Sequence, residues 1–388
     1  MNQMDDEKSE QFQQAEKTEE FLDENLINTL QQVVSSEFPV QDQFIERGVL
    51  SFQIEKIPNF KQAFLRLLEK LKPLGFSPFL RESNGRIILR VLKNPERKPS
   101  NILVNLVLFI ATIFTTFISG YLLSLGLVDY GLEEPLIGAA TFTISLMAIL
   151  GIHEMGHKIA ANIHGIEATP PYFIPGPPLL GTFGAVILQK SLPPNKDSLF
   201  DVGVSGPILG FIVAIIATAV GLLLSPAIPE EQVPPGTISI PVPLTYIAIR
   251  YFLSLAGLLQ IEAGKVVLLH PIAFAGWIGM VVTMLNLLPV GSLDGGHIAR
   301  SLFGEKARFA FLIISILVLS LNLNFFWPMI IILLLFSTYR HPGALDDVSE
   351  LSASRKIVAV IVIVIFVASI PINMEILEEI LGLFRGLL

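Results

Sequence analysis

The residues best suited to chemistry are His153, Glu154 and His157, which form a His-Glu-x-x-His sequence inside an apolar run. On a helix, positions i and i+4 lie on one face, so the two imidazoles can bind the same metal ion. Imidazole suits zinc, and the neighbouring carboxylate can deprotonate a metal-bound water. The pattern predicts metal-assisted hydrolysis, with one zinc ion per chain and Glu154 as the general base.

Two histidines leave a catalytic zinc site incomplete, because such sites use three protein ligands and keep one position open. The best third ligand is Asp294, at the end of a Pro- and Gly-containing stretch that breaks the fourth apolar segment. Irregular backbone at membrane depth is tolerated where it lines a polar cavity. The alternatives are His297 and His164, the latter about 10 Å beyond His157 if the helix continues. Asn286 could hydrogen-bond the reacting carbonyl or a neighbouring group.

The composition indicates which elements position these residues. The chain has 388 residues, of which 52% are hydrophobic and 15% are charged, whereas soluble domains carry about 25% charged residues. A purely soluble protein is therefore excluded. Apolar segments of spanning character run over about 101–125, 136–160, 202–225, 268–290, 307–322, 324–340 and 356–373. The fold class predicted is an α-helical polytopic membrane protein with about seven transmembrane helices (range six to eight) and a small soluble α/β N-terminal module.

The domain organisation follows from the uneven distribution of charge. Residues 1–37 are predicted to be an acidic disordered tail. Residues 38–99 are predicted to be a small cytoplasmic α/β module, and residues 100–388 a transmembrane domain with its catalytic core at about 136–300. Within the module, periodicity predicts strands at 49–55, 76–80 and 87–92 and a helix at 60–74.

Charge and cysteine content exclude several functions. A net charge of −8 without a basic patch argues against a nucleic-acid partner. The absence of Cys excludes disulfides, thiol catalysis and Cys-ligated zinc. The N-terminal residues do not have the pattern of a signal peptide. Lys and Arg in the short loops place the N-terminus and the active site on the cytoplasmic side. His270 and His341 are expected to be solvated at the membrane interface.

Two further segments are expected to lie near the metal. The small residues of Gly203-Val204-Ser205-Gly206-Pro207, opening the third span, favour close packing against the helix that carries the zinc ligands. The Pro- and Gly-rich stretch 170–190 cannot be a helix, and a strand is predicted within 181–188. Either the edge of this strand pairs with an extended substrate, or the stretch forms a hairpin at the bilayer surface. The substrate-binding candidates are Gly181, Thr182, Phe183 and Gly184.

Three motifs, together with their order along the chain, resemble those of the site-2 protease family of intramembrane zinc metalloproteases. They are the segments 153–157, 203–207 and 286–295. The N-terminal module, the Pro-rich loop and the lack of a large inserted domain are most similar to the EGY-type branch of chloroplasts, cyanobacteria and some archaea.

The resemblance implies zinc held by His153, His157 and Asp294, with Glu154 as the general base and Asn286 stabilising the reacting carbonyl. It implies a multi-pass protein of the cell membrane, or of a thylakoid or plastid membrane in a phototroph. The implied partners are membrane lipid and a single-span transmembrane substrate protein, cleaved near the cytoplasmic face.

The alternative from a different functional class is a non-proteolytic membrane metal protein, such as a divalent-cation transporter, or a scaffold that retains a metal site. A transporter should show paired repeats and polar residues scattered over several spans. In this chain the polar residues gather at two sites on one side, and Glu154 suits a base better than an ion conduit.

Overall fold

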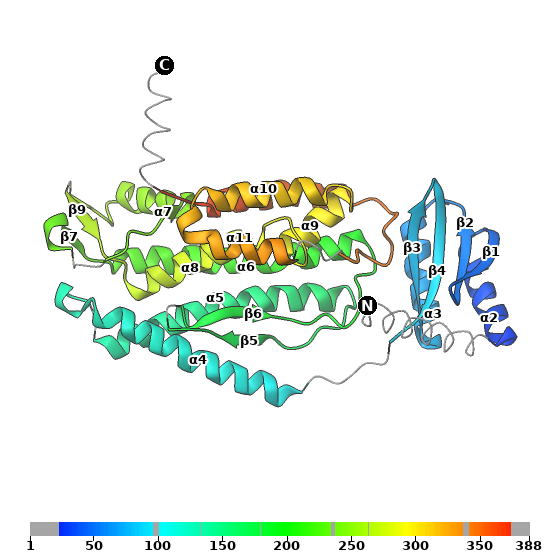
Figure 1. The fold of residues 1–388 in the computed structure, drawn as a ribbon, viewed down its shortest axis with the longest axis horizontal. Helices are drawn as coiled ribbons and strands as arrows, with labels where there is room; N and C mark the ends of the chain where they lie inside the picture. Colours follow the sequence, from blue (N-terminus) through cyan, green and yellow to red (C-terminus); the bar gives the residue numbers. More distant parts are fainter. Residues whose placement is uncertain are drawn as a thin grey trace, which may run out of the picture. The chain divides into compact units, whose positions relative to one another are not determined.

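The computed structural model describes residues 23–95, 101–132, 134–178, 180–233, 237–262, 264–336 and 341–373. The chain divides into two compact units. The first unit combines residues 1–99 with two later segments, 192–199 and 343–351, and the second contains the remaining residues. Each unit is described by itself below, and both are drawn in Figure 1.

The first unit is a four-stranded antiparallel sheet with strand order β1-β2-β4-β3 and two helices (Figure 1). Alternate strand residues such as Phe52 and Leu89 are buried and pack against Phe64 and Leu67 of the longer amphipathic helix. The elements are α2 (Glu24–Ser35), β1 (Val40–Glu46), β2 (Val49–Ile54), α3 (Phe60–Leu71), η1 (Lys72–Leu74), β3 (Phe76–Ser83) and β4 (Arg86–Lys93). The predicted helix and three strands are confirmed.

The expected disordered tail extends too far, because α2 begins at Glu24. Leu30 and Val34 on this helix are completely buried in the core of the unit. The acidic and Gln-rich composition concealed this short apolar stripe. Residues 1–22 of the expected tail lie outside the described residues. The sequence also gave no sign of β1, since an edge strand with polar residues at most positions has no alternating pattern.

Two later segments complete the first unit. The backbone N–H of Leu80 on β3 donates to the carbonyl of Leu345 (2.8 Å), and Leu345 is buried in the same core. The carbonyl of Pro193 accepts from the N–H of Leu345 (2.9 Å). Lys61 on α3 forms an ion pair with Asp197 (2.9 Å). The unit therefore includes more than the contiguous module 38–99 that the sequence suggests.

The second unit is mostly helical. Helices α4 (Ile102–Leu125), α5 (Pro135–Ile163) and α6 (Lys196–Leu223) are long and apolar enough to cross a membrane. Shorter helices are α7 (Leu244–Leu255), α8 (Pro271–Asn286), α9 (Asp294–Phe303), α10 (Arg308–Ser320), α11 (Leu323–Phe336) and α12 (Ala353–Ser369). The remaining elements are η2 (Val128–Tyr130), β5 (Tyr172–Pro175), β6 (Thr182–Val186), β7 (Ala227–Pro229), η3 (Glu230–Gln232), β8 (Val242–Pro243), β9 (Lys265–Val267) and β10 (Pro371–Ile372).

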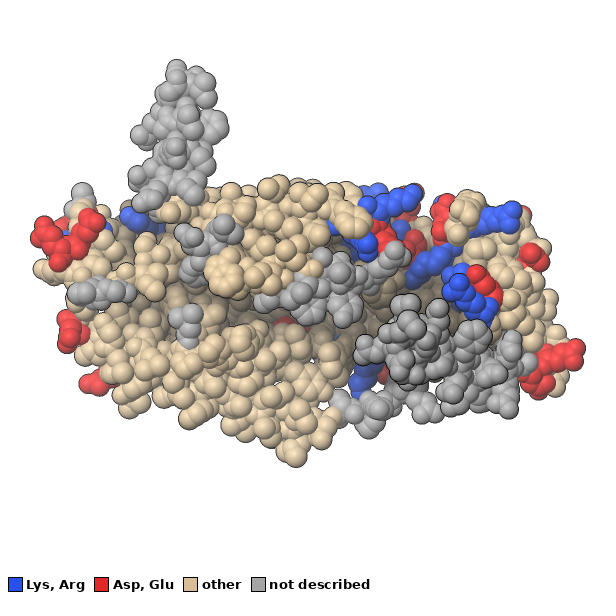
Figure 2. Space-filling model, in the orientation of Figure 1, with Lys and Arg blue, Asp and Glu red and all other residues tan. Residues whose placement is uncertain are grey.

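Each of the apolar segments identified in the sequence overlaps one of these helices. On the face drawn in Figure 2, the surface over α4 and α10 is almost free of charge, and charged side chains gather near the ends of these helices. Large hydrophobic side chains are exposed along α4, α10 and α12. Such a surface is stable in lipid and not in water, so this is a membrane protein. The number of spans stays a prediction, since three helices reach spanning length among the described residues.

Helix α6 begins earlier than the sequence pattern indicated. Its N-terminus is capped by Asn195, whose side-chain oxygen accepts a hydrogen bond from the N–H of Ser198 (3.0 Å). In return, the Ser198 hydroxyl oxygen accepts from the N–H of Asn195 (3.1 Å). This reciprocal capping starts the helix ahead of the apolar run. The segment 203–207 therefore lies inside α6, with Pro207 as a helical residue, and does not open the span.

Candidate metal centre

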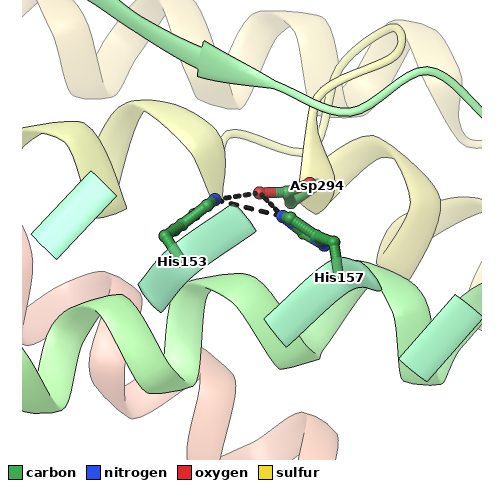
Figure 3. Close-up of side chains that lie close together, drawn as sticks. All are labelled: His153, His157 and Asp294. Atoms are coloured by element: carbon green, nitrogen blue, oxygen red, sulfur yellow. Dashed lines mark hydrogen bonds and ion pairs between the residues drawn. The ribbon is translucent and has the colours of Figure 1, made fainter. Parts of the chain in front are cut away.

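Three side chains from two helices converge on one point. His153 and His157 lie one turn apart on α5, and Asp294 is the first residue of α9. The two histidine Nε2 atoms are 3.1 Å apart. Asp294 Oδ2 lies 3.3 Å from each of them. Figure 3 shows both rings directed from the same face of α5 toward the carboxylate. Among the described residues, these three form the group that could hold a metal ion.

The donor set and its spacing fit zinc. Ligand atoms at tetrahedral zinc–nitrogen distances lie about 3.3 Å from one another. The three separations in this group are 3.1, 3.3 and 3.3 Å. Two imidazoles and one carboxylate are a ligand set of catalytic zinc sites, which leave a fourth position open. The structure thus brings together the three residues that the sequence analysis selected as ligands.

A backbone carbonyl orients one of the two imidazoles. The Nδ1 atom of His157 lies 2.7 Å from the carbonyl oxygen of Val202 on α6. With Nδ1–H as the donor, the lone pair of Nε2 is directed at the metal position, as is usual for a metal-ligating histidine. The sequence could not reveal this contact, because any residue at position 202 supplies the same carbonyl.

Glu154 is buried beside the group, with 5% of its surface exposed. The backbone N–H of Ile187, which follows β6, lies near this carboxylate. The end of the β5–β6 hairpin therefore lies next to Glu154. Like the Val202 carbonyl, the Ile187 amide is a backbone group that leaves no mark in a sequence.

Asn286, the last residue of α8, also reaches the group. Its Nδ2 atom lies 3.2 Å from Nε2 of His153. From there the chain turns sharply into α9. A side chain at Gly295 or Gly296 would overlap the carbonyls of Leu287 or Gly291, respectively. The two glycines therefore let the turn fold tightly enough to bring Asn286 and Asp294 to the same point.

Helices α5 and α6 pack closely at the metal ligands. A Cβ atom added to Gly156 would lie 2.6 Å from the carbonyl oxygen of Ser205. One added to Gly210 would lie 3.0 Å from Cβ of His153, and one added to Gly206 would overlap the ring of His157. The predicted packing of the small residues against the ligand-bearing helix is confirmed.

The other histidines make different contacts. Nδ1 of His297 lies 2.7 Å from Nε2 of His341, and His164 pairs with Asp201 at 2.9 Å. Neither alternative third ligand joins the group. The expectation that His270 is solvated is wrong, and His341 is only partly exposed. His270 is 1% exposed and caps α8 by accepting the N–H of the second helical residue. His341 is held beside α9 by its contact with His297.

The proposed substrate-binding residues belong to a two-stranded hairpin. Strands β5 and β6 pair antiparallel, and the predicted strand is confirmed as β6. Gly181 and Gly184 adopt positive φ angles of 77° and 104°. Thr182 donates its hydroxyl to the carbonyl of Ile174 (2.8 Å), whereas Phe183 is 73% exposed. The hydroxyl of Thr115 on α4 donates to the carbonyl of Gly181 (2.6 Å), which fixes the start of β6 on that helix.

Comparison with known proteins gives a family and several relatives. Residues 141–323 match the model of Peptidase family M50. The chain is 30% identical over 259 residues to the probable zinc metalloprotease EGY1, chloroplastic, of Arabidopsis thaliana. This alignment covers 65% of this chain and 46% of the relative. It is 32% identical over 262 residues to the protein of the same name from Oryza sativa subsp. japonica, covering 65% and 44%. The chain thus spans about half the length of these relatives or slightly less.

A solved structure, the site-2 protease from Methanocaldococcus jannaschii, aligns with 57% of this chain and 83% of its own at 20% identity. Its TM-score of 0.25 is too low to establish a shared fold. The family match and the relatives confirm the resemblance that the three sequence motifs indicated.

Proposed function

We propose that this chain, whose residues 141–323 match the model of Peptidase family M50, is a member of that family and an intramembrane zinc metalloprotease. Its reaction would be hydrolysis of a peptide bond within a transmembrane helix of another membrane protein. The observation that carries the proposal is the convergence of His153, His157 and Asp294 beside the buried carboxylate of Glu154.

Each residue has a role that its position supports. The two imidazoles and the Asp294 carboxylate would hold the zinc. Bound zinc supplies Lewis-acid chemistry and lowers the pKa of water to about 7. Glu154 takes a proton from the attacking water and returns it to the leaving amine nitrogen. The amide of Asn286, at the end of α8, donates a hydrogen bond to the reacting carbonyl oxygen, where negative charge develops.

The hairpin beside Glu154 suits an extended substrate. Residues Gly181, Thr182, Phe183 and Gly184 lie in and next to β6, and the N–H that follows this strand lies near the Glu154 carboxylate. A substrate strand paired with β6 would gain main-chain hydrogen bonds without side-chain demands. An intact helix hides its carbonyls, so the substrate must unwind locally. Gly, Pro or Asn near the cleaved bond should therefore favour cleavage.

The same proposal places the active site toward the cytoplasmic side of a multi-pass protein, in a plastid membrane or another cellular membrane. Arg300, Lys306 and Arg308 follow the metal ligand Asp294 along the chain, and such positive charge is typical of the inner side. The partner would be a single-span transmembrane protein. The transporter alternative is not favoured, because the described residues hold one metal-binding group and not a series of sites along a path.

The test compares wild type with Glu154→Gln, purified in detergent and added to a model transmembrane substrate. We expect about one zinc per chain in both and loss of cleavage in the variant alone, since the base is removed while the ligands stay. Glu262→Gln, at an exposed carboxylate paired with Lys265, is the matched control and should cleave like wild type. Cleavage by Glu154→Gln at the wild-type rate, or wild type purified without chelator and free of zinc, would refute the proposal.

A further inference from the structure

A cavity that the proposed reaction does not use is lined by residues of α9 and of the segments on either side of it. Its volume is about 60 Å³, which is small compared with drug-binding pockets. The four residues assigned to zinc and proton transfer are not among the described residues that line it. The lining comes from the turn after α8, from α9, from the start of α10 and from His341. Its residues are Pro289, Val290, Gly291, Gly296, Ala299, Arg300, Gly304, Glu305, Arg308, Phe309, Phe311, Leu312 and His341.

The polar part of the cavity is cationic. Arg300 is 9% exposed, and Arg308 stacks over the Phe309 ring at 4.4 Å. The Nη1 atom of Arg308 is buried with no hydrogen-bond partner among the residues that the structure describes. Glu305 is the one carboxylate of the lining. Burial, His297 and Arg300 lower the pKa of His341 to about 3, so its ring is neutral. The lining therefore carries two permanent positive charges, on Arg300 and Arg308, and one negative charge, on Glu305.

The cavity is continuous with an apolar surface along α10. Phe309, Ile313 and Leu317 follow one another at four-residue spacing, so they lie on one face of the helix. They are 63%, 59% and 60% exposed, respectively. Phe309 lines the cavity and also begins this row. Figure 2 shows Lys and Arg near the start of α10 and an uncharged surface beyond it. The cationic cavity therefore adjoins an exposed apolar stripe formed by these three side chains.

We propose that this cavity binds the phosphate of an anionic phospholipid, with the acyl chains lying along Phe309, Ile313 and Leu317. Guanidinium groups match phosphate oxygens in charge and geometry, and basic pockets between membrane helices bind anionic headgroups. Free phosphate shares the headgroup chemistry but leaves the apolar stripe unused. Since α9 contributes both Asp294 to the metal centre and Arg300 to the cavity, the lipid would support the helix that carries a metal ligand.

The experiment measures lipid retention by native mass spectrometry of the full chain in detergent. The probes are phosphatidylglycerol, phosphatidylcholine and inorganic phosphate. The variant is Arg308→Gln, because its side chain is only partly buried and the fold should tolerate the change. Lys306→Gln is the matched control, since it removes the same charge two residues away, from an exposed side chain outside the lining. Near-ultraviolet circular dichroism compares the folding of all three proteins.

We expect wild type and Lys306→Gln to retain phosphatidylglycerol in preference to phosphatidylcholine. Arg308→Gln should bind phosphatidylglycerol about tenfold more weakly, the effect of losing one charge-assisted hydrogen bond. Binding of inorganic phosphate that competes with the lipid and weakens in Arg308→Gln would support the phosphate site and identify the headgroup as sufficient. No preference for the anionic lipid, or equal losses in both variants, would overturn the proposal. The readout is binding, so a failed protease proposal leaves it unaffected.

Discussion

Substitution of Gly156 by Ala tests whether the contact between α5 and α6 holds the metal centre in shape. Helix propensity alone predicts that this change increases the stability of the folded protein by about 1 kcal/mol. The structure predicts the opposite outcome, because the new Cβ would lie 2.6 Å from the carbonyl oxygen of Ser205, where ordinary contacts begin at 3.4 Å. The helices must separate locally by about 0.8 Å, the difference between these distances.

That separation acts on the imidazole of His157. Its Nδ1 lies 2.7 Å from the carbonyl oxygen of Val202 on α6. If the helices moved apart by the full amount, this distance would reach about 3.5 Å, too long for a good hydrogen bond. Loss of such an outer contact weakens metal binding about 10- to 100-fold. Gly156→Ala should therefore bind zinc that much more weakly than wild type.

The assay is competition for zinc between the purified protein and a chromogenic chelator. Gly151→Ala is the matched control, because its Cβ would meet Phe173 at an ordinary 3.8 Å on the same helix. The control should bind zinc like wild type. Circular dichroism of both variants checks that the helices remain folded. Equal zinc affinities for the two variants would show that α6 yields without disturbing His157, and the reasoning from close packing would be wrong.

Three further predictions concern stability. Asn195→Ala removes the cap of α6 and should cost about 1 kcal/mol of unfolding free energy in chemical denaturation; an unchanged midpoint would contradict the capping role. Arg355→Met removes two hydrogen bonds to Asp201, at 2.8 and 2.5 Å, and should cost about 1 kcal/mol for this quarter-exposed pair. A double-mutant cycle with Asp201→Asn should show coupling of similar size, and additive losses would refute the pairing. Burial raises the pKa of Glu37, but Lys70 and Arg66 together outweigh burial and hold that pKa below its ordinary 4.5. The folded pKa is the lower one, so the stabilisation is complete above pH 4.5 and is lost as the pH falls below it. Hydrogen exchange of α3 amides should show this acid-dependent loss in wild type and less of it in Glu37→Gln.

The local elements and the chemistry available to them follow from the sequence alone. Its long apolar runs predicted the helices of the second unit, because a run of that length has few other stable structures. The spacing of His153 and His157 fixed their common face on α5, since i and i+4 are neighbours on any helix. Asp294 was selected because a zinc site needs a third ligand and the glycines beside it break the helix.

Features that depend on contacts between distant segments follow only from the three-dimensional fold. The Val202 carbonyl and the Ile187 amide reach His157 and Glu154 only through folding, and backbone groups carry no residue signal. The burial of His270 could not be anticipated. The sequence pattern of a polar residue at a helix end is the same whether water or protein surrounds that residue. The inclusion of Leu345 in the core of the first unit likewise depends on long-range packing. Sequence periodicity reports one helix or strand at a time, whereas these features are set by which segments meet in three dimensions.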